Sequence, residues 1–459
     1  MRVALIATTA LTGVATHQAM ADTLEHSLAL AYQNNPQINS QRAASRATDE
    51  NVGIALSGYR PTVRANASLG EQYLDTLQKA GPVTARTTGT IANPTYGLTA
   101  TQTLFNGYLT AGKTRQAEGQ VFAARETLRT TEQTVLFNAA TAYMNLLRDG
   151  ALLELQRNNV KVLEATLRQT RDRFTAGEVT RTDLAQAESS LAAGRSSLHA
   201  AESNYITSKA AYIQVIGVEP GKLASASPVD RFSPPTLTAA LARGATQNPA
   251  VSTAMYNVDT AVEQVKIAEA ALYPTLTVNG SMQKSYGSAT SLTTLETLSG
   301  SVVGQLSVPI YQGGGEYATI RQAKETLGQR RLDLDTARLS VQQNVTQSWG
   351  QLEAAKAQVD ANTAQVTSAE IALDGVREEA RVGQRTTLDV LNAQQALVSA
   401  RTALVTAQHD RIVASYAVLA SVGSLEPQIL GLHIESYDPM VHYQQVRDKW
   451  IGVRTPDGR

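Results

Sequence analysis

The chain has 459 residues, of which 42% are hydrophobic and only 5% aromatic, with 40 basic and 40 acidic residues. So few aromatic residues suit long packed helices better than one large globular core. The balanced charge gives no overall field that would attract nucleic acid or an acidic surface. Because the chain contains no cysteine, a disulfide-stabilised fold is excluded as well.

Residues 1–21 are predicted to be an export signal. Arg2 precedes an apolar run from Val3 to Val14, and Ala19-Met20-Ala21 fits a small-residue cleavage site. The alternative is an ordinary N-terminal helix. The mature chain would begin at Asp22, without the N-terminal cysteine of a lipoprotein anchor. No later stretch reaches the roughly 18 apolar residues of a transmembrane helix, so a membrane span would have to consist of strands.

An internal duplication gives the strongest indication of the fold. Pro36 and Pro61 match Pro249 and Pro274 at an offset of 213 residues, and from Phe105 onward the offset is 206. The second set of matches pairs Phe105 with Tyr311, Gly107 with Gly313, Gly177 with Gly383, Asp183 with Asp389 and Gly217 with Gly423. One structural unit is therefore used twice. We expect repeat 1 over 22–217, a linker over 218–235, repeat 2 over 236–423 and a C-terminal tail over 424–459.

Each repeat contains one pair of strand-like segments, within 62–105 and 275–310. Their side chains alternate, and each segment has about the 9 to 11 residues that cross a bilayer as a tilted strand. The polar stretches between the partners, Glu71 to Asn93 and Lys284 to Ser299, are expected to be surface loops. Aromatic residues gather at the strand ends, as interfacial girdles would require: Tyr59, Tyr73, Phe105, Tyr108, Tyr273, Tyr286 and Tyr311.

Four strands cannot close a barrel by themselves. An open edge in lipid leaves backbone groups unpaired, at a cost of several kcal/mol each. Several chains must therefore share one barrel if these strands span a membrane. The alternative is a soluble antiparallel sheet with aromatic residues on its outer face.

Two long helices are expected, from Tyr108 to Ala176 and from Gly314 to Val382, because neither range contains proline. Such helices are on the order of 100 Å long. Apolar residues recur every seven positions in both, as in a coiled-coil seam: Leu146, Leu153, Val160, Leu167 and Phe174, then Leu352, Val359, Val366, Leu373 and Ala380. Shorter helical stretches are expected at 24–56, 182–216, 237–272 and 386–422.

Each long helix is predicted to end and turn back at a glycine, Gly177 or Gly383. The return helices then begin with the pattern T-x-x-D, at Thr180 to Asp183 and at Thr386 to Asp389. In this pattern a threonine and a carboxylate cap a helix start reciprocally. Helix capping is therefore the expected role of both aspartates.

One motif favours a different class of protein. Residues 107–114, Gly-Tyr-Leu-Thr-Ala-Gly-Lys-Thr, match the phosphate-binding loop of an ATPase. However, the preceding strand alternates where a buried parallel strand would be continuously apolar. The repeat partner of Gly112-Lys113-Thr114 is Ala318-Thr319-Ile320, so the fold forms without the motif. We therefore expect no enzyme and no cofactor. The five histidines after residue 21 have no metal-ligand spacing: His26, His199, His409, His433 and His442.

Three motifs resemble the TolC-type outer-membrane efflux proteins. They are the Asn-Pro pairs at 35–36 and 248–249, Leu-Ser-Val-Pro-Ile-Tyr-Gln-Gly-Gly at 306–314, and Val-Gly-Gln-Arg-Thr-Thr-Leu-Asp-Val-Leu-Asn at 382–392. The resemblance covers Asp22 to about Gly423. The tail, with Tyr437-Asp438-Pro439 and residues 446–451, resembles the BepC branch of the family.

The resemblance implies a mainly α fold with a β-barrel portion. Three chains would share a twelve-stranded barrel, four strands from each, and their coiled-coil hairpins would form a tunnel across the periplasm. The implied partners are two further copies of the chain, outer-membrane lipid, a periplasmic adaptor protein and an inner-membrane pump or ABC transporter. Such a duct exports drugs, dyes, detergents, bile salts or proteins. A periplasmic coiled-coil adaptor without a membrane span is the alternative.

The resemblance also implies a gate at the periplasmic entrance. Family positions that hold it shut match Thr182, Asp183, Arg385 and Asp389. Asn392 stands where relatives carry a second acidic residue, so we expect a less negative constriction. Asp183 is expected to pair with Arg385 of a neighbouring chain. The adaptor is expected to contact the tips at Phe174, Gly177, Arg381, Val382, Gly383 and Thr386.

Overall fold

The computed structural model describes residues 22–286 and 296–458. The predicted export signal and the centre of the predicted second loop, 287–295, lie outside the described residues. The elements in chain order are α1 (Leu24–Asn34), α2 (Pro36–Leu56), η1 (Ser57–Tyr59), β1 (Thr62–Ser68), β2 (Glu71–Ala80), β3 (Val83–Ala92), β4 (Thr95–Asn106), α3 (Leu109–Thr175), α4 (Arg181–Ile216), η2 (Asp230–Phe232), α5 (Leu237–Gln247), α6 (Pro249–Glu269), η3 (Ala270–Leu272), β5 (Thr275–Tyr286), β6 (Glu296–Ser307), α7 (Gly315–Arg381), α8 (Thr387–Val422) and α9 (Pro439–Val446).

The chain divides into two compact units, and each draws on both sequence repeats. Unit 1 contains residues 22–40, 130–248 and 341–436, and unit 2 contains 41–129, 249–340 and 437–458. Unit 2 holds the strands, and unit 1 holds both turns between the paired helices.

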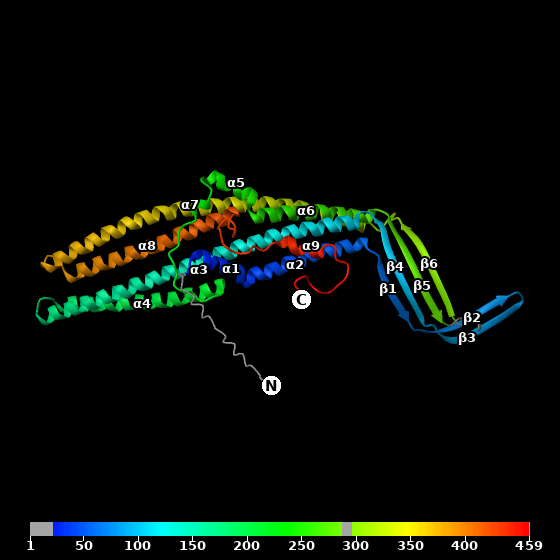
Figure 1. Cartoon of the computed structure of the whole chain (residues 1–459), viewed down its shortest axis with the longest axis horizontal. Coiled ribbons are helices and arrows are strands. Elements are labelled where there is room, and N and C mark those ends of the chain that lie inside the picture. The colour runs from blue at the N-terminus through cyan, green and yellow to red at the C-terminus, as the bar shows by residue number, and fades with distance from the viewer. Residues whose placement is uncertain (1–21, 287–295, 459) are drawn as a thin grey trace, which may run out of the picture. The chain divides into compact units, whose positions relative to one another are not determined.

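The four predicted strands form one antiparallel sheet in unit 2, in the order β1-β4-β5-β6 (Figure 1). Along β4 the side chains of Tyr96, Leu98, Ala100 and Leu104 are exposed, whereas their neighbours are half-buried. The predicted alternation is therefore confirmed along β4, whereas every residue of β1 and β6 is exposed. A register shift between Thr103 and Phe105 makes Leu104 the extra residue of a β-bulge.

The predicted loop from Glu71 to Asn93 is wrong, because its residues form a β-hairpin. β2 and β3 pair along their whole lengths, from Glu71 opposite Ala92 to Ala80 opposite Val83. Arg86 and Asp75 form a cross-strand ion pair, and its hydrogen bond lowers the pKa of the aspartate. Four threonines in β3 favour the extended backbone.

The second predicted loop, from Lys284 to Ser299, is also shorter than expected. β5 continues to Tyr286, and β6 begins at Glu296. The two strands pair from Thr275 opposite Ser307 to Tyr286 opposite Glu296. The hydrogen-bonded ladder therefore extends into sequence whose composition indicates a loop. At its other end β6 stops at Ser307, before the predicted limit of 310.

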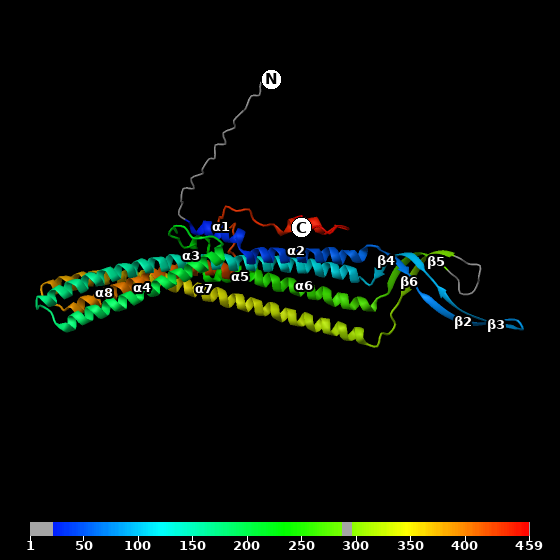
Figure 2. The same ribbon diagram turned by 90° about the horizontal axis from the view of Figure 1, so that it is seen from below.

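Both long helices are confirmed, and α3 and α7 each contain 67 residues. Figures 1 and 2 show α4 alongside α3 and α8 alongside α7. The predicted heptad residues Leu146, Leu153 and Leu352 are buried, as a coiled-coil seam requires. Phe174, the last heptad residue of α3, is an exception with 38% exposure.

The two shorter helical stretches that begin the repeats are each interrupted at an asparagine. Asn35 separates α1 from α2, and its side-chain amide donates to the Val215 carbonyl oxygen at 2.8 Å. Asn248 separates α5 from α6 and donates in the same way to the Ser421 carbonyl oxygen at 2.8 Å. The following prolines restart the helices at a position where no N–H is needed. The helical stretches predicted over 24–56 and 237–272 are therefore present, and each is divided into two α-helices at its asparagine.

The main core of unit 1 joins α1, α3, α4 and α8. It includes Leu28, Leu136, Tyr143 and Leu419, all fully buried or nearly so. The Tyr143 hydroxyl donates to the backbone carbonyl oxygens of Asp22 and Ala224 at 2.8 and 2.7 Å. This side chain thus fixes the start of the described chain and the segment between the repeats to the same helix.

No helix in the described part of the chain is long and apolar enough to cross a membrane.

Candidate functional site

The turn between α3 and α4 closes around Gly177, which has φ of +78°. The Glu178 N–H donates to the Arg173 carbonyl oxygen at 2.9 Å, and the Gly177 N–H donates to the Phe174 carbonyl oxygen at 3.0 Å. This pair of hydrogen bonds defines a Schellman motif, in which a glycine takes the left-handed position. We call residues 174–183 the first tip.

The turn between α7 and α8 repeats this geometry. The Gln384 N–H donates to the Glu379 carbonyl oxygen at 2.9 Å, and the Gly383 N–H donates to the Ala380 carbonyl oxygen at 3.2 Å. Gly383 has φ of +80°. Residues 380–389, the second tip, thus have the same backbone hydrogen bonds as the first tip, as the constant offset between the repeats predicts.

A capping box begins the return helix of each tip, as predicted. In the first, the Thr180 N–H donates to Asp183 Oδ2 at 2.9 Å, and the Asp183 N–H donates to Thr180 Oγ1 at 3.3 Å. Hydrogen bonds from the hydroxyl and backbone of Thr180 lower the pKa of the Asp183 carboxyl. Asp183 is therefore ionised and already engaged within its own helix at neutral pH.

Asp389 caps α8 in the same way. It accepts from the Thr386 N–H at 3.0 Å and from the Thr386 hydroxyl at 2.9 Å. The backbone bond is the larger cause that lowers the pKa of the Asp389 carboxyl, and Arg385 contributes weakly. Both tips thus present an ionised carboxylate at a helix N-terminus.

Most of the residues predicted to form the gate or to contact an adaptor are exposed, whether they are polar or apolar. Thr182, Arg385 and Asn392 are exposed, and Asp183 and Asp389 are half-buried. Val382 is 68% exposed, although it is apolar. Six residues predicted to contact an adaptor are exposed: Phe174, Gly177, Arg381, Val382, Gly383 and Thr386.

Arg385 has a partner within its own chain. Its Nε donates to Glu379 Oε2 at 2.8 Å, and this hydrogen bond raises the pKa of the guanidinium. An ion pair also spans the turn of the first tip, where Arg173 Nε lies 3.1 Å from Glu178 Oε2. The order of the charges along the chain is reversed between the two turns: the arginine comes before the first turn and after the second.

Two duplicated contacts behind the tips were missed from the sequence. Arg171 donates to Glu188 at 3.1 Å, and its repeat partner Arg377 donates to Gln394 at 3.0 Å. Arg195 likewise donates to Glu164 at 2.9 Å, and Arg401 to Glu370 at 2.7 Å. Each contact joins the outgoing helix to the return helix. The signal was available at the offset of 206 residues, where both arginines recur, Glu164 recurs as Glu370, and Glu188 is replaced by Gln394.

The two hairpins also contact each other. Leu391 of α8 belongs to a buried cluster with Val160 and Leu163 of α3 and Leu191 of α4. Gly194 permits the close approach of α4 to α3, since a Cβ there would lie 2.6 Å from Leu163 Cδ1. Because this cluster involves both repeats, movement of the second hairpin would have to break an apolar contact with the first.

The phosphate-loop motif has a structural explanation in unit 2. The Gly112 N–H donates to the Tyr108 carbonyl oxygen at 2.9 Å within the first turn of α3. A Cβ at Gly112 would lie 2.9 Å from the Ile267 side chain of α6. Lys113 is exposed. Gly112 thus permits helix packing, and its amide is already used within the helix.

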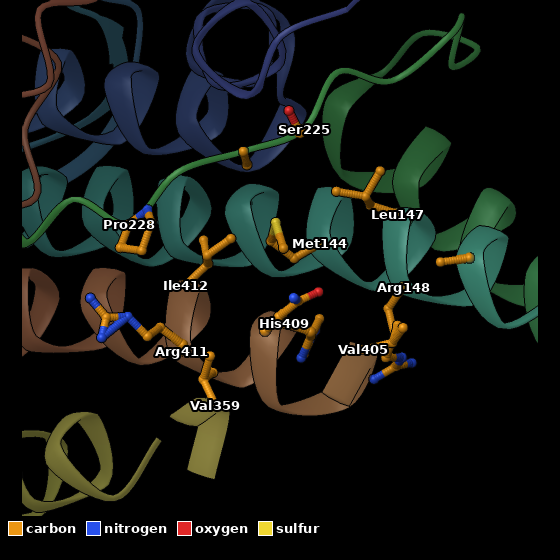
Figure 3. A pocket seen from close by; sticks show the side chains of 13 residues that line it. Met144, Leu147, Arg148, Ser225, Pro228, Val359, Val405, His409, Arg411 and Ile412 are labelled. Carbon is orange, nitrogen blue, oxygen red and sulfur yellow. The ribbon is translucent and has the colours of Figure 1, made fainter. Parts of the chain in front are cut away.

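A cavity of about 340 Å³ lies in unit 1, where the segment between the repeats crosses α3 and α8 (Figure 3). Met144, Pro228 and Ile412 give it apolar walls. His409 lies in its wall, with Nε2 2.9 Å from Asn145 Oδ1 and Nδ1 2.8 Å from Asp410 Oδ1. Both ring nitrogens therefore have structural partners. Among the described residues, no group of three or more His, Cys, Asp or Glu side chains is arranged to hold a metal ion.

Comparison with known proteins agrees with this architecture. Residues 28–218 and 241–424 match the outer membrane efflux protein family. The chain belongs to the outer membrane efflux protein family. It is 41% identical to outer membrane efflux protein BepC of Brucella suis over 464 residues, which cover 99% of this chain and 96% of that protein. It is 26% identical to TolC of Escherichia coli, with 86% and 81% of the two chains covered.

Solved structures show the same fold at lower identity. The Campylobacter jejuni CmeC outer membrane channel matches with a TM-score of 0.77 at 16% identity, over 93% of this chain and 89% of that chain. CusC matches with a TM-score of 0.75 at 17% identity, over 88% and 92%. The predicted family, fold class and outer-membrane location are therefore confirmed, and the family consists of transport channels, not enzymes.

Proposed function

We propose that this protein is the outer-membrane exit duct of a tripartite efflux or type I secretion system, and that it works as a homotrimer. The open sheet carries the proposal. Among the described strands, β1 and β6 are the edges, and successive strands alternate in direction. The bilayer core offers no hydrogen-bonding partner for the unpaired backbone N–H and C=O groups of an edge strand. Because β1 and β6 run in opposite directions, β1 of one copy can continue the sheet antiparallel to β6 of the next.

Three copies would give a closed barrel of twelve strands, four from each. An eight-stranded barrel is filled by its own side chains, whereas a larger number of strands leaves a passage. The trimer number comes from the family resemblance, and the open edges supply the physical reason for assembly. Exposed apolar residues on β4 and β6, such as Leu98 and Val302, would face lipid.

Cysteine cross-linking tests the shared barrel, and the chain is suited to it because it contains no cysteine. Ala65→Cys on β1 is combined in turn with cysteine at each β6 position from Gly300 to Gly304. Oxidation should link three chains in at least one combination. The control is Ala65→Cys with Leu98→Cys, which are directly opposite within one chain and should give only monomers. A largest product of two chains in every combination at complete oxidation, or no intermolecular product in the whole series, would contradict the trimer.

The tips would dock a periplasmic adaptor. Their backbone is rigid, being fixed by a Schellman motif and a capping box, while Val382 offers apolar surface. Val382→Asp should abolish export but leave the trimer intact, since this side chain is 68% exposed and its loss removes little packing. The proposed polar gate lies in the same region and comprises Thr182, Asp183, Arg385, Asp389 and Asn392.

The cargo follows from the inner-membrane partner. Relatives include an alkaline protease secretion protein and a pyoverdine export outer membrane protein of Pseudomonas aeruginosa. We propose toxic small molecules or proteins as the exported class. A deletion strain should become sensitive to drugs, dyes or bile salts, or should lose a secreted protein, and the full-length gene should restore the lost trait. Neither change in a strain with an intact envelope would contradict a duct.

A further inference from the structure

We propose that the C-terminal tail carries a membrane-surface anchor, residues 449–454 (Lys-Trp-Ile-Gly-Val-Arg), which inserts into the lipid leaflet on the helical side of the strands. This inference rests on the proposed membrane span of β1, β4, β5 and β6. We call residues 449–454 the tail loop. Its partner is a phospholipid surface with anionic headgroups.

The tail is firmly attached to unit 2 before it reaches this loop. α9 lies alongside α2 (Figures 1 and 2), and His442 Nδ1 lies 2.9 Å from Asp49 Oδ2 of that helix. Tyr443 packs against the buried cluster of Val52, Ala117 and Val121. Val446, at the end of α9, is itself buried. The position of the following residues is thus fixed by packing.

Arg60 joins the tail loop to the junction between helix and sheet. Its Nη1 donates to the Lys449 carbonyl oxygen at 2.9 Å, and its guanidinium carbon lies 4.6 Å from the centre of the Trp450 ring. Arg60 stands between Tyr59, an exposed aromatic residue, and β1, which begins at Thr62. The loop is therefore held at the level where the proposed span begins.

The loop itself is closed, with its apolar side chains pointing outward. Lys449 Nζ donates to the Arg454 carbonyl oxygen at 2.7 Å, and Gly452 takes φ of +117° between them. Trp450, Ile451 and Val453 are 67%, 89% and 99% exposed. Exposing these apolar side chains to water is unfavourable, and at such exposures their packing within unit 2 offsets little of that cost.

The composition of the loop fits a bilayer surface. Tryptophan is enriched at membrane interfaces, where its ring is apolar and its N–H can stay hydrated. Basic residues next to apolar ones add attraction to anionic headgroups. Here Lys449 and Arg454 flank three apolar side chains, and the loop contains no acidic residue. A lipid surface with anionic headgroups would accept the apolar side chains and attract the basic ones, and the loop lies next to the proposed membrane span.

Fluorescence quenching tests the inference on the full-length protein. The chain has two tryptophans, so Trp349→Phe leaves Trp450 as the only one. This variant is reconstituted into phosphatidylethanolamine and phosphatidylglycerol vesicles, with or without brominated acyl chains. Insertion predicts that brominated lipid reduces the Trp450 emission at least twofold. Trp450→Phe, which retains Trp349 of α7, is the matched control and should be quenched far less.

A third protein separates failure of the anchor from failure of the proposed function. Leu98→Trp, in a chain with both native tryptophans replaced by phenylalanine, reports on the exposed face of β4. Quenching of Trp at position 98 without quenching of Trp450 would overturn the anchor alone. Absence of quenching at both would overturn the span as well. Trp450 emission protected from both brominated lipid and aqueous iodide would mean that a protein surface covers the loop, and would also overturn the proposal.

Substitution of the apolar residues provides a second measurement. Ile451→Glu with Val453→Glu removes no buried contact, because both side chains are almost fully exposed. In the Trp349→Phe chain, this double change should remove at least half of the quenching by brominated lipid, with the trimer unchanged on gels. Full quenching in the double variant would contradict insertion of the loop.

Discussion

Arg385 Nε lies 2.8 Å from Glu379 Oε2, so that the guanidinium proposed to lock the channel is already paired within its own chain. An inter-chain bond to Asp183 must therefore compete with this local pair. Asp183 is in turn engaged by Thr180. Closure in this protein would be a competition between contacts within one chain and contacts between chains, in which a bond from Arg385 to Asp183 would release Glu379 from its ion pair.

The first prediction concerns Arg385. Arg385→Ala should raise the single-channel conductance of the purified protein in planar bilayers severalfold, because it removes the guanidinium of the proposed inter-chain pair with Asp183. Glu379→Gln should have the opposite effect or none, since it frees Arg385 from its local partner. Equal conductance for wild type and Arg385→Ala would mean that Arg385 stabilises the turn through Glu379 and does not close the channel.

The second prediction concerns the charge of Asp389. Asp389→Asn keeps a side-chain oxygen that can accept from the Thr386 N–H, but it removes the negative charge. Divalent cations added on the periplasmic side should then block the channel more weakly, while α8 begins at the same residue. Asp389→Ala should weaken both the block and the helix start. Undiminished block in Asp389→Asn would show that the charge of this residue does not contribute to the block by divalent cations.

The third prediction separates Lys113 from Gly112. Lys113→Ala should change the free energy of unfolding by less than about 0.5 kcal/mol and leave export unaltered, because the side chain is exposed. Gly112→Leu should destabilise the protein by about 1–3 kcal/mol, since its side chain would overlap Ile267. Chemical denaturation and an export assay measure the two effects. Loss of export in folded Lys113→Ala would instead favour nucleotide binding.

The fourth prediction is a pH dependence at the tail. Burial is the main cause that raises the pKa of Asp49 above its ordinary value of 3.8, and the hydrogen bond and charge of His442 and the charge of Arg125 oppose it. Glu50 adds to the rise. A raised pKa means that the folded protein keeps a proton that the unfolded chain has lost. The contribution of Asp49 to stability therefore falls as pH rises from 3.8 through the folded pKa.

Asp49→Asn should abolish this contribution to the pH dependence. Hydrogen exchange of the α9 amides, measured from pH 4 upward, should show a steeper loss of protection in the wild type than in the variant. The matched control is Asp438→Asn, at the exposed N-cap of α9, which should keep the wild-type slope. Parallel slopes for wild type and Asp49→Asn would show that Asp49 stays ionised throughout.

Local chemistry explains what the sequence by itself determined. The heptads of α3 and α7, the glycines at 177 and 383 and the two T-x-x-D boxes act over one or two helical turns. Their interactions depend on neighbouring residues, so the pattern alone located both hairpins and both caps. The duplication did the same for architecture, because an offset kept without gaps over a long stretch requires the same structure twice.

Contacts between distant residues decided the rest. The stretch from Glu71 to Asn93 is polar and has the composition of a loop, yet its threonines pair across a hairpin once the two segments meet. Asn35 and Asn248 interrupt their helices because each finds a carbonyl more than 170 residues away, at Val215 and Ser421. The position of the tail loop likewise did not follow from the sequence, since it depends on the contact of Trp450 with Arg60, which is distant in the chain. Which distant residues become partners depends on how the whole chain packs, and the periodic pattern of a sequence does not identify them.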